Sequence, residues 1–221
     1  MKPTTYKSKL LDCISINRMY IYIVFLFATL YLPNAFILIE DLSLFTAYDP
    51  SGGKYVTAIE SLFNAPYYSM HDGDNGKLYG WTYLAINFAI LAPIKLLLAV
   101  LGIENNVAVY TTTRLVIFSV GLISAITFYA ITKRLLANKI IAFCAVIMFI
   151  ISPVDYTLFY LLQPESTGLM FALLAMLMLI KFIAQPYKYK LYFGALGCLV
   201  LAVLSQQLFY LFSLPVLAIF F

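Results

Sequence analysis

Long apolar stretches separated by polar connections run along most of the chain. Five of them reach the roughly 20 residues that an α-helix needs to cross the hydrocarbon core of a bilayer. These stretches cover residues 19–39, 113–132, 140–162, 166–184 and 191–213, the third with Pro153 inside it. The pattern predicts an all-α fold, a polytopic transmembrane helical bundle that forms a single domain over residues 1–221.

A sixth apolar stretch, residues 80–101, is ambiguous. Pro93 interrupts it and Lys95 falls near its middle, where a charge at bilayer depth is costly. Trp81 and Tyr83 at its start are residue types that prefer the membrane–water interface. We therefore expect a juxtamembrane or re-entrant helix at the outer surface rather than a sixth crossing.

Most basic residues gather in three clusters. Ten of the fourteen Lys and Arg side chains belong to them, and Asp12 is the one acidic residue among them. The clusters are Lys2, Lys7, Lys9 and Arg18; Lys133, Arg134 and Lys139; and Lys181, Lys188 and Lys190. Short loops rich in Lys and Arg stay in the cytoplasm, so all three clusters are expected inside. This assignment requires that residues 80–101 do not cross the membrane, because one more crossing would reverse the last two clusters.

Composition strengthens the membrane assignment. Hydrophobic residues make up 63% of the 221 residues and charged residues 11%, whereas a soluble domain carries roughly 25% charged residues. The distribution of charge matters more than its net value of +4, and no nucleic-acid partner is expected. The first apolar stretch follows lysines, as in a signal peptide, but it has full spanning length and no small-residue cleavage site after it, which predicts a retained anchor.

The connection over residues 40–112 is unusually long. Besides the 80–101 stretch, it contains a predicted amphipathic helix at about residues 53–64 and a turn-rich segment at 71–77. Long connections are usually functional or disordered. Because this one is neither low in complexity nor highly charged, we expect a structured juxtamembrane outer loop.

Two carboxylates on the outer side are candidates for chemistry. Asp49 lies ten residues after the first predicted span and could accept a proton from an acceptor hydroxyl; the alternative is a turn residue, since Asp-Pro-Ser-Gly is favourable turn chemistry. Glu165 stands at the outer start of the fourth predicted span. The alternative for Glu165 is a helix N-terminal residue, because Pro164 and Glu165 fit a first helical turn.

Further polar residues on the outer side suggest ligand binding. Asp72 and Asp74 resemble a carboxylate pair that holds a divalent cation, although the same residues suit an ordinary loop. His71 is the only histidine, which excludes a histidine-rich metal site, and no other cofactor is expected. Lys77 and Arg114 could pair with phosphate oxygens, and snorkelling at the interface is the alternative for both.

The order of these features resembles a known family. A first span is followed by an outer loop with an Asp, an amphipathic helix and an aromatic-rich segment. Thr-Arg-Leu then opens a span, Lys-Arg-Leu-Leu-Ala-Asn-Lys forms a basic inner turn, and Ser152-Pro153 precedes a second acidic loop. This order resembles the C-type membrane glycosyltransferases, in particular the protein O-mannosyltransferases and the lipid A aminoarabinose transferase. The resemblance runs from about residue 23 to 221 and is best over residues 114–181.

The resemblance implies roles for four residues. Asp49 falls where the family keeps its first-loop catalytic carboxylate, although Pro50 stands where the family usually has Glu. Glu165 takes the place of the second-loop Asp, and Arg114 matches an Arg at the outer start of its span. Lys77 lies where the family often has a basic residue, without the proline pair that usually follows. Arg114 and Lys77 would then bind the phosphate of the donor.

The function implied by the resemblance is transfer of a sugar from a polyprenyl-phosphate donor to an acceptor at the outer face of the membrane. The expected location is a bacterial inner (plasma) membrane with the N-terminus in the cytoplasm. Family members usually continue through further spans, so the chain is expected to be the N-terminal part of a longer enzyme. Two other functions remain open: a transporter or flippase subunit, and a non-catalytic membrane assembly subunit.

Overall fold

A computed structural model describes residues 4–36, 80–101, 106–136, 138–160 and 163–205. Within these ranges the chain is helical and contains no strand, which confirms the all-α class. Part of the predicted outer loop, including the helix expected at about 53–64, lies outside the described residues, as do four of the six candidate residues: Asp49, Asp72, Asp74 and Lys77.

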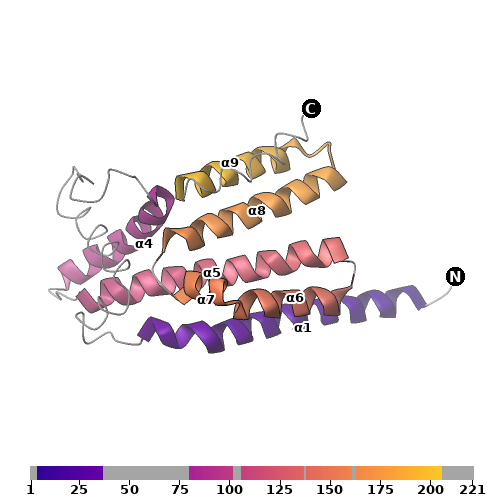
Figure 1. The fold of residues 1–221 in the computed structure, drawn as a ribbon, viewed down its shortest axis with the longest axis horizontal. Helices are drawn as coiled ribbons and strands as arrows, with labels where there is room; N and C mark the ends of the chain where they lie inside the picture. The colour runs from indigo at the N-terminus through magenta and orange to yellow at the C-terminus, as the bar shows by residue number, and fades with distance from the viewer. Residues whose placement is uncertain (1–3, 37–79, 102–105, 137, 161–162, 206–221) are drawn as a thin grey trace.

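The helices form a bundle with one oblique member. Helices α1, α5, α6, α8 and α9 run along the long axis of the molecule, whereas α4 lies at one end (Figure 1). In chain order the elements are α1 (Thr4–Tyr31), the 3₁₀ helix η1 (Leu32–Phe36), α4 (Trp81–Val100), α5 (Asn106–Leu136), α6 (Lys139–Ile151), α7 (Pro153–Tyr160), α8 (Pro164–Ala184) and α9 (Tyr189–Ser205).

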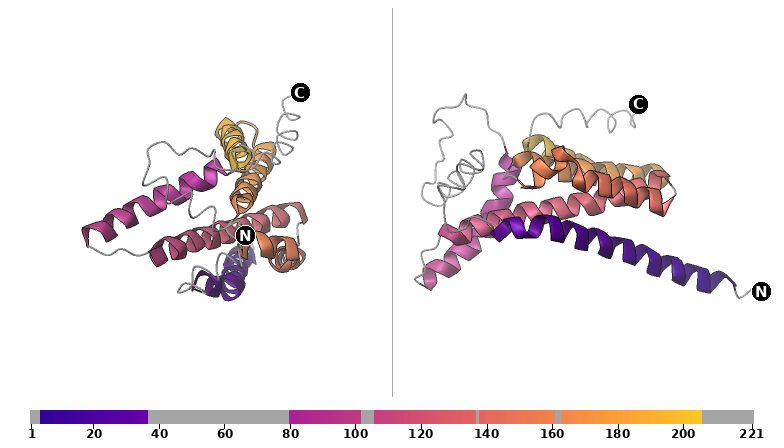
Figure 2. Two further views of the ribbon diagram at one scale, coloured as in Figure 1. Left: turned by 60° about the vertical axis from the view of Figure 1, so that its left-hand side comes forward. Right: turned by 60° about the horizontal axis from the view of Figure 1, so that its bottom comes forward.

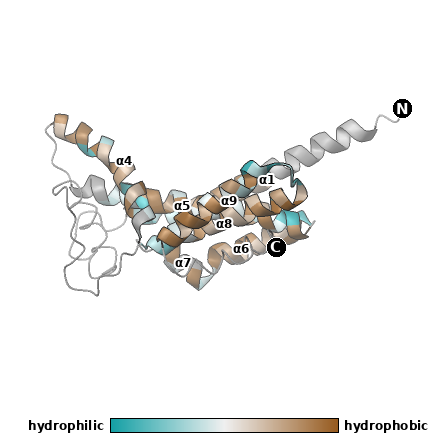
Figure 3. Cartoon of the chain, turned by 90° about the horizontal axis from the view of Figure 1, so that it is seen from above, coloured by the Kyte–Doolittle hydropathy of each residue, from teal (hydrophilic) through white to brown (hydrophobic). Residues whose placement is uncertain are grey.

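Four stretches of helix are long and apolar enough to cross a membrane, among the residues described. They are Arg18–Phe36, Thr82–Val100, Tyr110–Leu136 and Pro164–Ala184. Helices α6 and α9 are also apolar but shorter. Figure 3 shows hydrophobic colour along the helices and hydrophilic patches near the ends of the bundle, the distribution expected of a polytopic membrane protein.

The stretch predicted to be one span at 140–162 is two helices. Helix α6 ends at Ile151, Ser152 takes an extended ψ of 133°, and Pro153 opens α7. The cause is steric, because a proline disfavours helical backbone in the residue before it and suits the first position of a new helix. At 1.5 Å per residue, α6 alone reaches about 20 Å, short of the roughly 30 Å hydrocarbon core, and α7 adds about 12 Å.

The main core is aromatic and joins α1, α5, α6 and α7. On α1, Ile23, Phe27 and Tyr31 recur every four residues and are buried, as one face of a helix requires. The Tyr31 hydroxyl donates a hydrogen bond of 2.6 Å to the backbone carbonyl of Ile150, just before the α6–α7 break. The remaining buried members of the cluster are Ala125, Tyr129, Ala142, Val146, Ile150 and Phe159.

Two smaller clusters attach the last two helices. Helices α8 and α9 pack as an antiparallel hairpin around Ala175, Leu179 and Leu199, with other apolar residues. Met170 of α8 packs against Val116 and Val120 of α5. The start of α8 is thereby held beside the first half of α5.

Helix α4 packs against α5, α8 and α9. Its Thr82 hydroxyl donates a 2.8 Å hydrogen bond to the Leu201 carbonyl of α9, and Leu91 is buried. In its second half Leu97 and Val100 are exposed. Figure 2 shows α4 starting beside the α8–α9 pair and running obliquely away from it. Gly80, at φ 84°, caps its start in a left-handed conformation that glycine adopts without strain.

The two ends of the bundle differ in character. The start of α1, the α5–α6 connection and the α8–α9 turn lie at one end, and α4 with the start of α8 lies at the other (Figure 1). The basic residues of the last two predicted clusters therefore share one end, which we call the basic end. The orientation of that end in a membrane stays a prediction.

Candidate functional site

The end opposite the basic end contains the two candidate residues that the structure describes, Glu165 and Arg114. Glu165 belongs to the first turn of α8, and Arg114 lies near the start of α5. Packing of Met170 against Val116 joins these two regions. The shared cavity predicted for Asp49 and Glu165 involves a residue outside the described ranges and stays a prediction.

Glu165 occupies the helix N-terminus expected for it. Pro164 takes the first helical position after Gln163, and the Ser166 hydroxyl donates a 2.7 Å hydrogen bond to the Gln163 carbonyl. The Glu165 Oε2 atom is buried and has no hydrogen-bond partner in the described part of the chain. A carboxylate gains roughly 0.3–1 kcal/mol from the helix dipole, less than the roughly 1–3 kcal/mol or more lost by a buried acceptor without a partner.

The interaction of Glu165 with the helix dipole therefore does not compensate for the hydrogen bond that its Oε2 atom lacks among the described residues. Next to it on α8, the hydroxyl of Thr167 is also buried and has no hydrogen-bond partner among the described residues. Buried polar groups are normally paired, which makes these two groups candidates for binding a polar atom. Thr167 was not a sequence-based candidate, because a threonine inside an apolar helix usually bonds its own backbone.

On α4, Asn87 is fully buried inside an apolar stretch. Its amide nitrogen donates a 2.9 Å hydrogen bond to the Tyr83 carbonyl one turn earlier, while its Oδ1 atom has no partner among the described residues. A buried amide inside an apolar helix normally needs partners. The signal that could have identified Asn87 from sequence is its position as a lone amide among Ala, Ile, Phe and Leu.

Arg114 joins α5 to the end of the first helix. It is buried, and its Nη1 atom donates hydrogen bonds to the backbone carbonyl and, at 2.8 Å, to the side-chain Oδ1 of Asn34. Asn34 belongs to η1, the element that precedes the segment with Asp49. Snorkelling, the alternative considered for Arg114, does not fit a buried guanidinium with two hydrogen bonds to one residue. The structure therefore gives Arg114 a role in attaching η1 to α5.

An apolar groove of 440 Å³ runs between α4, α5 and α8. Ile86, Ile90 and Ile94 of α4 form one wall, and Met170 of α8 lies at its base. The α5 wall is formed by Thr112, Leu115, Val116, Ser119, Val120 and Ile123. The groove has the composition of a binding site for a hydrocarbon chain, with a few hydroxyl groups among branched aliphatic side chains.

The groove and the carboxylate lie in the same half of the bundle. Met170 follows Glu165 by five residues, which is about 7.5 Å along the axis of α8 and about 140° around it. Lys95, whose charge would be costly at bilayer depth, lies one residue beyond Ile94 and is half-buried. No group of three or more potential metal ligands occurs in the described part of the chain. The possible cation site at Asp72 and Asp74 falls outside that part.

Comparison of the chain with protein-family models, curated proteins and solved structures found no match. The resemblance to C-type membrane glycosyltransferases therefore stays a hypothesis based on the order of sequence features. What is established is the coarser statement, an all-α polytopic bundle with helices long enough to span a membrane.

Proposed function

We propose that this protein is a membrane glycosyltransferase that moves a sugar from a polyprenyl-phosphate donor to an acceptor at the outer face of the membrane. The observation that carries the proposal is the apolar groove between α4, α5 and α8. It lies in the same half of the bundle as Glu165, whose buried Oε2 atom has no partner among the described residues. A polyprenyl donor has the matching chemistry, an apolar tail with a polar sugar phosphate at one end.

In this proposal Asp49 accepts the proton of the acceptor hydroxyl or orients it. Glu165 supports the reacting groups through the Oε2 atom. Arg114 and Lys77 supply positive charge for the donor phosphate, which leaves with the developing negative charge; fixed cations stabilise such a leaving group. Arg114 also bonds Asn34 of η1. In this proposal it contributes to the site both by its charge and by positioning the segment that leads to Asp49.

Oblique packing of α4 fits this arrangement. A helix that lies along the outer surface, as expected from Pro93, Lys95 and the positive-inside rule, would form the wall over which a lipid tail enters. The exposed second half of α4 offers apolar surface for that purpose.

A transporter is the alternative that one observation favours. Discontinuous helices often mark transport sites near the bilayer midplane, and α6–α7 is discontinuous at Ser152. However, α6 begins at the basic end and the break comes about 20 Å later, beyond the midplane of a roughly 30 Å core. The break therefore belongs to the outer half of the bundle, which suits a surface site better.

Binding of undecaprenyl phosphate to the purified protein tests the groove. We expect the lipid phosphate to raise the thermal unfolding midpoint, and Ile90→Trp, which fills the groove, to weaken binding about tenfold or more. Ile140→Trp is the matched control, because Ile140 is exposed on α6, away from the groove. Equal binding by Ile90→Trp and Ile140→Trp would remove the groove from the proposal.

A further inference from the structure

Two cavities meet at the basic end, away from the groove. One, of 210 Å³, lies between α5, α8 and the α8–α9 turn and is lined by Arg134, Lys181, Ala184, Gln185, Lys188 and Leu191. The other, of 330 Å³, lies between α1, α5 and α8 and is lined by Tyr20, Ala130, Lys133, Arg134, Leu177 and Lys181. Arg134 and Lys181 line both cavities.

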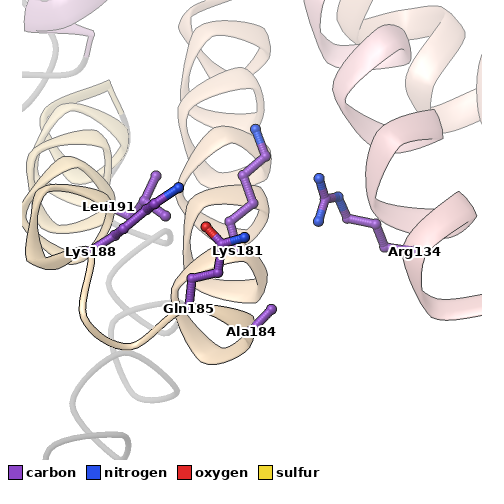
Figure 4. A pocket seen from close by; sticks show the side chains of 6 residues that line it. All are labelled: Arg134, Lys181, Ala184, Gln185, Lys188 and Leu191. Atoms are coloured by element: carbon purple, nitrogen blue, oxygen red, sulfur yellow. The ribbon is translucent and has the colours of Figure 1, made fainter.

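The cations come from three segments and share one space. Figure 4 shows Arg134 extending from α5 toward α8, and Lys188 extending from the α8–α9 turn toward Lys181. Lys181 is half-buried between them, whereas Arg134 and Lys188 are exposed. Cations that serve only to set topology have no need to converge, because the positive-inside rule acts on their number and not on their geometry.

No acidic side chain near these cations is described. Among the side chains that the structure describes, Glu165 is the only carboxylate, and it lies sixteen residues before Lys181 on α8, about 24 Å along the helix. Like charges brought together repel, and a bound anion reduces that repulsion. A planar guanidinium with ammonium groups on the opposite side of the cavity suits phosphate oxygens in particular.

The surroundings of the cavities are apolar and aromatic. Leu135 on α5 and Ile183 on α8 are about 60% exposed beside the cations, and Tyr187 on the turn and Tyr189 at the start of α9 are exposed. Exposed aliphatic side chains at the ends of spanning helices, with tyrosines next to them, are typical of the membrane–water boundary. The anion at this place is therefore expected to carry hydrocarbon chains.

We infer that the basic end is a binding site for the headgroup of an anionic phospholipid. Arg134 and Lys181 bind its phosphate from both sides, and Lys188 closes the smaller cavity. The Gln185 amide is available to a glycerol hydroxyl. In the larger cavity Ala130 and Leu177 provide apolar contact for the start of an acyl chain. Basic pockets between membrane helices are recurrent sites for such headgroups.

The test uses the purified full chain in a neutral detergent with dioleoyl phosphatidylglycerol as the probe, followed by native mass spectrometry and thermal unfolding. The double variant Arg134→Gln/Lys181→Gln is expected to weaken binding about tenfold or more, since hydrogen bonds to charged groups are lost. The matched control, Lys139→Gln/Lys190→Gln, removes the same charge at the same end outside both cavities and is expected to bind within about twofold of the original.

Further arms separate the possible sources of the signal. Ala184→Trp fills the smaller cavity without changing charge and is expected to weaken binding, which keeps the inference testable if the double variant fails to fold. Glycerol phosphate, a headgroup without tails, is expected not to stabilise the protein at lipid concentrations. Ile90→Trp in the distant groove is expected to leave phosphatidylglycerol binding unchanged.

The inference is overturned by any of three results: equal loss of binding in the two double variants, equal binding of dioleoyl phosphatidylcholine and phosphatidylglycerol, or equal binding of free glycerol phosphate and the lipid. The first would assign the effect to net charge, the second to the tails, and the third to a site for a soluble phosphate.

Discussion

Gly121 of α5 faces phenyl rings from two other helices in the aromatic core. A Cβ atom built there would lie 2.5 Å from Cζ of Phe27 and 2.9 Å from Cδ1 of Phe159. The two phenyl rings, from α1 and α7, pack edge to face with centroids 5.6 Å apart. The absent side chain at position 121 therefore makes room for the rings.

Replacement of this glycine tests the packing. Gly121→Ala is expected to lower stability, because overpacking costs roughly 1–3 kcal/mol and exceeds the roughly 1 kcal/mol gained in helix propensity. Gly197→Ala is the control, since a Cβ there meets no atom within 4 Å. Thermal unfolding in one detergent compares the two; a Gly121→Ala midpoint equal to that of Gly197→Ala would show that the rings are not closely packed around position 121.

A neutral isostere separates the proposed role of Glu165 in sugar transfer from its position in the first turn of α8. Glu165→Gln is expected to lower sugar transfer at least about tenfold while changing stability by less than about 1 kcal/mol, the magnitude of a dipole interaction. Glu165→Asp is expected to keep part of the activity because it keeps the charge. The measurements are transfer rate and unfolding midpoint for both variants. Unchanged transfer by Glu165→Gln would leave this residue as a helix N-terminal residue only.

At the scale of elements, the helices could be predicted from hydropathy. An apolar run of about 20 residues can cross a bilayer only if its backbone groups bond one another, which a helix achieves. The predicted start of the fourth span, residue 166, differs from the start of α8 by two residues, since Pro164 extends the first turn. The extension of α5 to Leu136 was not predicted, because the apolar run ends before Lys133 while the helix continues through it.

The break at Ser152 illustrates what hydropathy misses. The apolar run continues through Pro153, so a hydropathy argument favours one helix, whereas the ring of Pro153 imposes extended backbone on the preceding residue. In the candidate site, Arg114 and Glu165 were predictable as charges beside apolar runs. The Arg114–Asn34 contact was not, because the two residues are 80 positions apart and only packing of α5 against η1 brings them together.

Helix α4 provides the sharpest test at this scale. Single cysteines at positions 105 and 137, in a background without the three native cysteines, are to be treated with an impermeant thiol reagent outside intact cells. We expect labelling at 105 and none at 137, because a non-crossing α4 keeps the basic end inside. Permeabilised cells, in which both positions react, provide the control. Labelling at 137 without labelling at 105 would mean that α4 crosses, and the outer placement of Glu165 would be lost.

At the scale of the whole molecule, the two ends of the bundle have different chemistry. The end with α4 has the groove, a buried carboxylate oxygen without a partner among the described residues, and the buried Arg114 bonded to Asn34. The basic end has converging cations and exposed tyrosines. This polarity fits a protein that is anchored at one leaflet by anionic lipid and works on a lipid-linked substrate at the other.

Sugar transfer by membranes that contain the protein is the measurement that tests the central claim most directly. Undecaprenyl-phosphate mannose and undecaprenyl-phosphate aminoarabinose, each with a labelled sugar, are the donor probes, and release of undecaprenyl phosphate is followed. The account predicts turnover of one donor by the original protein and a loss of roughly 100-fold or more in Asp49→Asn at an equal membrane level, because a general base contributes about that much. Turnover of neither donor above that of membranes without the protein, or equal turnover by Asp49→Asn, would contradict it.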